Sequence, residues 1–68
     1  MKKKLYTLLI AVVEEEDGYS HDVEIARHDG DVKFSKDETK ELIEKFERTL
    51  HKDQILCDVF EEIEWLHY

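Results

Sequence analysis

Two early runs of the chain have the apolar patterning of β-strands, and each is followed by an Asp-Gly pair. The pairs are Asp17-Gly18 and Asp29-Gly30. Asp-Gly between such runs is a strong hairpin signal, because the central positions of the turn need positive φ. The sequence therefore predicts a three-stranded antiparallel meander with strands at about 4–14, 19–28 and 31–34.

The first of these strands is apolar on both faces, although a meander in this order leaves it at the edge of the sheet. A two-residue loop at Asp17-Gly18 pairs Ile10 with Ile25 and directs one set of side chains inward, namely Tyr6, Leu8, Ile10 and Val12. A five-residue loop exchanges the two faces, so both registers stay open. Exposed apolar edge strands favour association. We therefore predict a homodimer interface at the remaining set, which is Leu5, Leu9, Ala11 and Val13.

Helical spacing replaces the strand patterns after Ser35. Ser35 and Glu38 have the S-x-x-E form of a capping box, and the apolar positions that follow recur at helical spacing, at Leu42, Ile43, Phe46 and Leu50. Asp53 is expected to cap a second helix, whose apolar face is Ile55, Leu56, Val59, Phe60, Ile63 and Leu66. A single bent helix fits the same pattern.

The expected fold class is therefore α+β. It is a three-stranded antiparallel β-meander followed by two α-helices (β-β-β-α-α), with the helices packed on one face of the sheet. The chain is expected to form a single small acidic domain over residues 1–68. At this length one hydrophobic core supplies only roughly 3–5 kcal/mol of stability.

Acidic residues dominate the composition, with 18 Asp and Glu against 10 Lys and Arg and a formal net charge of −8. The lone Cys57 excludes an intrachain disulfide and suits a reducing compartment, so we expect a cytoplasmic protein. The basic start and the apolar run at 5–13 look like a signal peptide, but acids stand where the cleavage site would be. Nothing approaches the roughly 18 apolar residues of a membrane span.

Residues that perform catalysis or bind metals elsewhere form no recognised pattern here. The histidines have no H-x3-5-H spacing, and zinc motifs such as Cys-x-x-Cys and H-E-x-x-H are lacking. Cys57 is expected to pack inside the second helix, without a base to activate it. We therefore expect no catalytic residues, no metal and no cofactor. The negative charge disfavours direct binding to nucleic acid.

Two acidic groupings are candidate binding surfaces. One is the tip of the first hairpin, with Glu14, Glu15, Glu16 and Asp17, and the other lies on the second helix, with Asp58, Glu61, Glu62 and Glu64. Carboxylates three or four positions apart on a helix stand about 5–6 Å from each other. This is close to the phosphate spacing of a nucleic-acid strand, so they fit a basic groove built for DNA or RNA. Trp65 and Tyr68 are candidate contacts, since both residue types are common in interface hot spots. Trp65 is alternatively a cover for the rim of the core.

The segment Glu15-Glu16-Asp17-Gly18-Tyr19-Ser20 after an apolar strand resembles the first hairpin of HicB-type antitoxins, which opens a small partial ribonuclease-H-like domain. The chain departs from that pattern later, because it lacks a Leu-Pro-Gly-Cys-like segment and because no further strand is expected after the first helix. In size, charge and lack of catalytic motifs, the chain is also similar to phage-encoded inhibitors of host nucleases, anti-CRISPR proteins included.

These features favour a non-enzymatic acidic binding protein. The leading interpretation is an inhibitor from a phage or mobile element, acting in the host cytoplasm. It would bind a basic, nucleic-acid-handling protein, for example a nuclease, through surfaces that imitate nucleic acid, and the charge would accelerate the encounter. The alternative is a homodimeric antitoxin-like or regulatory interaction domain that associates through the first strand. Neither a membrane nor nucleic acid is an expected direct partner.

Overall fold

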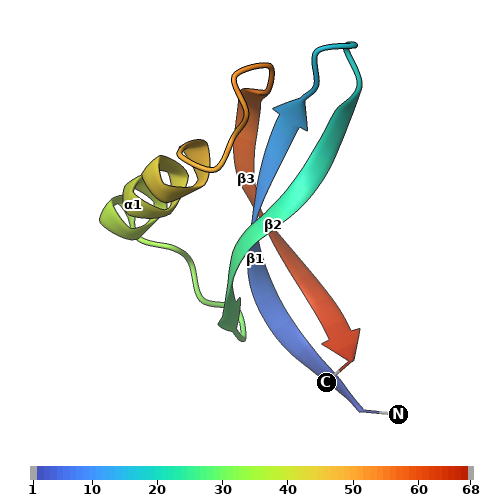
Figure 1. The fold of residues 1–68 in the computed structure, drawn as a ribbon. Coiled ribbons are helices and arrows are strands. Elements are labelled where there is room, and N and C mark those ends of the chain that lie inside the picture. Colours follow the sequence, from blue (N-terminus) through green and yellow to red (C-terminus); the bar gives the residue numbers. More distant parts are fainter. Residues whose placement is uncertain (1, 68) are drawn as a thin grey trace.

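A computed structural model describes residues 2–67 of the chain. Its elements are β1 (Lys3–Glu14), β2 (Ser20–Asp29), α1 (Lys36–Glu47) and β3 (Ile55–His67). The strands form one antiparallel sheet in the order β2-β1-β3, with α1 on one side of it (Figure 1). The α+β class is retained, but the predicted β-β-β-α-α order is wrong, since one helix is present and the third strand follows it.

β1 is the central strand of this sheet. It pairs with β2 from Tyr6 to Glu14 and with β3 along its whole length. A strand that has a neighbour on each side, and whose side chains are buried on both faces of the sheet, is apolar on both faces. The residues of β1 that are at most 1% exposed are Thr7, Leu9, Ala11 and Val13.

The predicted edge position of β1 is therefore wrong. Of the four residues assigned to a dimer interface, Leu9, Ala11 and Val13 are buried inside the chain, and Leu5 is half-buried. Their apolar side chains fill the interior of the protein. Leu9, Ala11 and Val13 are therefore not accessible for self-association.

The β1–β2 hairpin closes with the five-residue loop, because Glu14 pairs with Ser20. Gly18 has a φ of 89°, and its N–H donates to the carbonyl of Glu15 at 2.9 Å. The register with a two-residue loop is wrong. The alternative register directs Leu9, Ala11 and Val13 towards the side of α1, and Tyr6, Leu8 and Ile10 towards the opposite face of the sheet.

The strand predicted at 31–34 does not form. Gly30, with a φ of 79°, turns the chain out of β2. The buried hydroxyl of Thr7 then donates to the carbonyl of Gly30 at 2.7 Å and accepts from the N–H of Val32 at 3.1 Å. These bonds attach the loop to the middle of the sheet. The ring of Phe34, 7% exposed, reaches the ring of His28 with centroids 4.2 Å apart.

The first predicted helix is confirmed as α1. Ser35 is its N-cap, and its hydroxyl accepts from the N–H of Glu38 at 3.1 Å. The carboxylate of Glu38 lies 3.0 Å from Nε2 of His28, so it joins the helix start to β2 instead of returning to the cap. Leu42 and Phe46 lie beside Val23 and Ile25 of β2, and α1 packs mainly on that strand.

The second predicted helix is wrong, because its residues form β3. The stretch contains β-branched and aromatic residues, which favour strands. Its side chains alternate with a period of two: Asp58, Phe60, Glu62, Glu64 and Leu66 share one face, while Val59, Glu61, Ile63 and Trp65 share the other. Pairing with β1 supplies the second neighbour that a strand apolar on both faces requires, and this overrides the local helical spacing.

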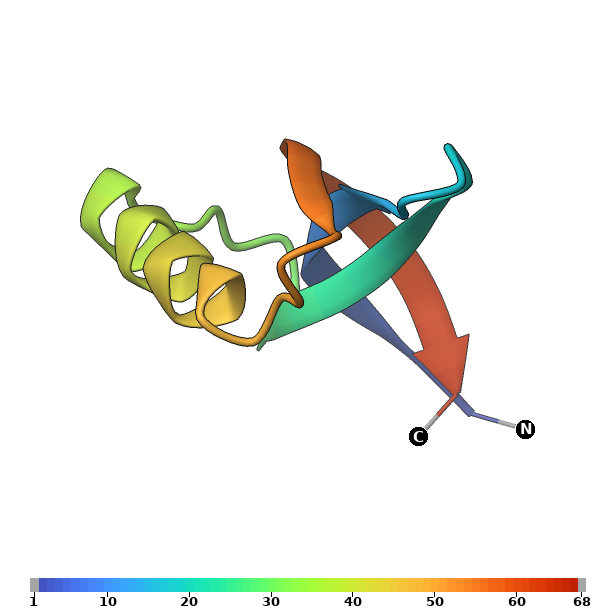
Figure 2. The same cartoon turned by 45° about the horizontal axis from the view of Figure 1, so that its top comes forward.

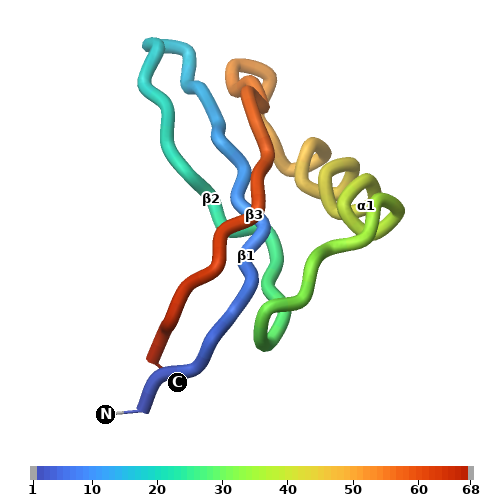
Figure 3. Tube along the Cα trace, turned by 180° about the vertical axis from the view of Figure 1, so that it is seen from behind, coloured from blue at the N-terminus to red at the C-terminus, as the bar shows by residue number. Residues whose placement is uncertain are grey.

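β2 and β3 run in the same direction on either side of β1, and the segment containing α1 connects them across one face (Figures 2 and 3). This is a split β-α-β arrangement. It leaves the opposite face of the sheet without a helix. Within residues 2–67, no helix is long and apolar enough to cross a membrane.

The central position of β1 predicts a large effect of truncating Leu9, which is 1% exposed. Leu9→Ala should lower the free energy of unfolding by about 2–5 kcal/mol, because it removes buried contacts and leaves a cavity. Urea denaturation measures this. Ile55→Ala, at a side chain that is 61% exposed, is the control and should change the free energy by about 0.5 kcal/mol or less. Equal effects of the two substitutions would contradict the central position of β1.

Candidate functional site

The face of the sheet opposite α1, here named the open face, has an apolar row along its middle. Tyr6, Leu8 and Ile10 of β1 are 8%, 4% and 6% exposed, and the partly buried Leu66 of β3 packs against them. Val12 continues the row and is half-buried. This row is the part of the hydrophobic core that lies on the side without a helix.

Charged residues flank the apolar row on both sides. From β2, the residues opposite Tyr6, Leu8, Ile10 and Val12 are Asp29, Arg27, Glu24 and Asp22. From β3, the residues opposite the same four positions are Glu64, Glu62, Phe60 and Asp58. Side chains on one face of a strand repeat about every 7 Å, and the two outer strands stand about 10 Å apart. The open face therefore has two rows of mainly acidic side chains with an apolar strip between them.

The two basic side chains of this face neutralise part of the β2 row. The guanidinium of Arg27 makes a fork with Glu24 at 2.8 and 2.7 Å, and it lies 4.9 Å from the centroid of the Tyr6 ring. The hydrogen bond to Glu24 raises the pKa of Arg27 above its usual value. Lys4 Nζ binds Asp29 at 2.8 Å. Glu24 and Asp29 are therefore less available to a partner.

Three carboxylates of the open face have no such neutralising contact. Within the part of the chain that the structure describes, Asp22, Glu62 and Glu64 make no ion pair and no side-chain hydrogen bond. Asp22 and Glu62 are exposed, and Glu64 is half-buried. Among residues 2–67, Asp58 bonds only to the N–H of its neighbour Val59, at 2.8 Å. These carboxylates therefore keep their charge without an ion pair among the described residues.

The acidic grouping predicted on a second helix is thus divided between two faces of a strand. Asp58, Glu62 and Glu64 lie together on the open face, whereas Glu61 lies on the other face and accepts from the N–H of Phe34 at 3.2 Å. The predicted helical spacing is wrong for all four. The β2 acids were not among the predicted site residues, although the alternation of Ser20, Asp22 and Glu24 in the sequence was the signal for them.

The acids at the hairpin tip have differing environments. Glu15 accepts from Nε2 of His21 and from Nε2 of Gln54, both at 2.7 Å, and so joins the hairpin to the segment before β3. These bonds, that of His21 first, hold the pKa of Glu15 below its ordinary value of 4.5. Asp17 accepts from the N–H of Tyr19 within the loop. Glu16 and Asp17 are exposed, so only part of this grouping is open to a partner.

Cys57 is exposed rather than packed in a helix, so that expectation is wrong. It occupies the irregular position of β3, between the residues opposite Val12 and Val13. Partial loss of hydration raises the pKa of its thiol, and the carboxylate of Glu14, 3.4 Å from Sγ, raises it further. The thiolate, the reactive form, is therefore disfavoured.

The predicted aromatic contacts lie at the end of β3. Trp65 is 63% exposed on the α1 side of the sheet, opposite Leu5, so it is not a buried cover of the core rim. Tyr68 lies outside the described residues. Ile63, which is 52% exposed, is the neighbour of Trp65 on the same face.

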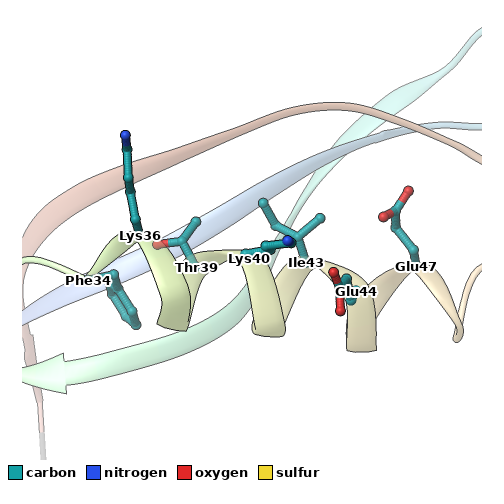
Figure 4. A pocket seen from close by; sticks show the side chains of 7 residues that line it. All are labelled: Phe34, Lys36, Thr39, Lys40, Ile43, Glu44 and Glu47. Carbon is teal, nitrogen blue, oxygen red and sulfur yellow. The ribbon is translucent and has the colours of Figure 1, made fainter.

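A groove of about 480 Å³ runs along α1 (Figure 4). It is lined by Phe34, Lys36, Thr39, Lys40, Ile43, Glu44 and Glu47. None of the residues predicted as a site from the sequence lines it. Among residues 2–67 there is no cluster of three or more His, Cys, Asp or Glu side chains that is suited to a metal ion.

No protein-family model matches the chain, and no curated protein or solved structure matches it. The likeness of the first hairpin to HicB-type antitoxins therefore remains a resemblance over about twenty residues, centred on Glu15–Ser20. One of the departures expected from the sequence was wrong, since a further strand, β3, does follow the first helix.

The contacts of Glu15 predict a pH-dependent contribution to stability. A carboxyl group whose pKa is lowered by folding stabilises the protein above its ordinary pKa, and this contribution is lost as pH falls through the lower folded value. Wild-type protein should therefore lose more stability than Glu15→Gln when pH falls from neutral to below 4.5. Urea midpoints across this range measure the difference.

Glu16→Gln is the matched control for this experiment, because the neighbouring Glu16 is exposed and makes no side-chain contact in the described residues. Its pH dependence should follow that of the wild type. If Glu15→Gln followed it as well, the bonds to His21 and Gln54 would not be stabilising the folded state.

Proposed function

We propose that the chain is a non-enzymatic binding protein whose open face binds a basic protein surface of the kind that holds nucleic acid. The observation that supports this most directly is the pair of acidic rows on either side of an apolar strip. Within it, Asp22, Glu62 and Glu64 make no ion pair in the described part of the chain. In this proposal the protein inhibits its partner by occupying the nucleic-acid surface.

The dimensions of the open face support this proposal. Its two rows stand about 10 Å apart, which lies between the widths of the minor and major grooves of B-DNA, about 6 and 12 Å. A protein surface that binds two phosphate backbones carries Lys and Arg at comparable separations. This separation of the acidic rows follows from strand geometry, in place of the helical spacing expected from the sequence.

Phe60 adds a contribution that charge alone does not provide. Protein interfaces that are stable have an apolar centre and a polar rim. On the open face, Leu8 and Ile10 are already buried within the chain, and Phe60, 38% exposed, is the apolar side chain that a partner can cover among the acids. Charge would accelerate the encounter and set its salt dependence, and burial of Phe60 would contribute to the lifetime of the complex.

The homodimeric antitoxin-like alternative has lost its main support, because the surface assigned to it lies on the central strand β1. Phage or mobile-element origin, action in a cytoplasm and the nuclease class of the partner remain predictions. They follow from charge and size, and the geometry of the open face neither depends on them nor tests them.

The test compares two variants with the same change in charge. Asp22→Asn/Glu62→Gln/Glu64→Gln neutralises part of the open face, and Glu44→Gln/Glu47→Gln/Asp53→Asn neutralises exposed acids of α1 and of the segment before β3. Each variant and the wild type are immobilised separately and incubated with a bacterial lysate. The bound proteins are then eluted with increasing salt. A recovered partner is then purified and titrated in the presence of labelled duplex DNA or RNA.

We expect a basic nucleic-acid-binding partner that loses its DNA or RNA when wild-type protein is added. Neutralising the open face should weaken this displacement by more than about tenfold, since close charge pairs at interfaces often exceed 1.4 kcal/mol each. The control should retain it. If both variants weakened displacement equally, the effect would come from net charge and not from the open face, which would contradict the proposal. A partner that keeps its nucleic acid would contradict it as well.

A further inference from the structure

We propose that the outer edge of β3 receives an extended segment of the basic partner as an added strand. This inference rests on the proposed function, because it assigns the way in which the same partner is held. The occupant is a strand in which Lys or Arg alternates with apolar residues. Such β-augmentation uses backbone hydrogen bonds for affinity and side-chain pairs for specificity.

The first observation is the state of this edge. β3 pairs with β1 on one side, and from Asp58 to His67 the pairing has no irregularity. On its other side it has no strand neighbour within residues 2–67. Alternate residues of an edge strand point their N–H and C=O groups outward, which makes a template for another strand.

The second observation is that exposed apolar side chains occur on both faces of this edge strand. Phe60, on the open face, is 38% exposed, while Ile63 and Trp65, on the α1 side, are 52% and 63% exposed. α1 packs mainly on β2 and leaves this part of β3 uncovered; Figures 1 and 3 show the last part of β3 extending away from the helix. Proteins usually protect such an edge. β2, the other edge strand, has an irregularity near Ile25.

Charge disfavours a second copy of the chain as the occupant. A two-fold antiparallel pairing centred on Glu61 or on Glu62 sets that acid opposite itself, and one centred on Ile63 sets Glu62 opposite Glu64. Like charges directly opposite each other destabilise a sheet. The same acids stabilise a strand that carries Lys or Arg at those positions.

The register of β3 specifies the pattern of the added strand. Glu62 and Glu64 lie on the open face and require basic side chains opposite them, whereas Ile63 and Trp65 lie on the α1 side and pair best with apolar ones. The basic residues of the added strand would then extend the contact already proposed for the open face. One segment of the partner would therefore contact both the acidic open face and the edge of β3.

The experiment uses the full chain and a set of synthetic peptides without tryptophan. The first alternates Lys and Val, and the second has the same composition in two blocks. Two further alternating peptides are N-methylated, one at every Val and one at every Lys. Fluorescence anisotropy of labelled peptide measures affinity. The chain has one tryptophan, so the emission of the exposed Trp65 reports whether this part of β3 becomes covered.

We expect the alternating peptide to bind with a blue shift of Trp65 emission and the block peptide to bind more than tenfold more weakly. Successive residues of a strand point their N–H groups to opposite edges. Only one of the two methylated peptides should therefore lose binding, and its identity gives the direction of the added strand. Ile63→Thr should weaken binding several-fold, while Ile55→Thr, an exposed position before the irregularity of β3, should leave it unchanged.

If all four peptides bind alike and are released by salt, strand addition is wrong while an electrostatic role of the open face remains. If no peptide binds, or if both methylated peptides bind as well as the parent, strand addition is also wrong. In each of these cases the displacement experiment with the neutralised open face decides the proposed function separately.

Discussion

Pairing of β1 on both sides is the constraint on which the rest of this protein depends. The chain contains one strand that is apolar on both faces, and a sheet of this size can bury it only by placing it in the centre. β2 reaches it through a hairpin, and β3 must then approach the opposite edge, which requires the chain to cross one face. Thr7, Gly30 and Phe34 fasten this crossing to the sheet. One face thus carries α1, and the other is left with side chains alone.

Features that depend on neighbours in the sequence could be predicted. The Asp17-Gly18 turn and the Ser35 cap are local, and both form where the pattern places them. The assignment of Ile55–Leu66 was wrong because its apolar residues satisfy helical spacing while its composition favours a strand. The apolar character of both faces of β1 was the missing clue. It was interpreted as an interface between copies, whereas it records the presence of a second neighbouring strand.

The candidate site likewise combines features that local sequence predicts with features that depend on distant strands. Glu62 and Glu64 were recognised from charge alone, but the surface they belong to depends on β2, whose acids come more than thirty residues earlier in the chain. No local pattern aligns Asp22 and Asp58 on either side of Val12; only the two registers with β1 do so. The geometry of the open face is therefore a property of the sheet topology. The sequence alone therefore predicts the charge of the open face but not its shape.

The pairing of Lys3 with His67 has a consequence for synthesis of the protein. Translation proceeds from the amino end, so the β1–β2 hairpin leaves the ribosome well before β3 does. During that interval one edge of β1, with its apolar side chains, has no partner strand. Sheets built on such distant pairings form slowly, and their unpaired edges are prone to aggregation. The acids Glu14 to Asp17, at the end of β1 and just after it, and the three acids of β2 give nascent chains like charge, which keeps them apart by repulsion.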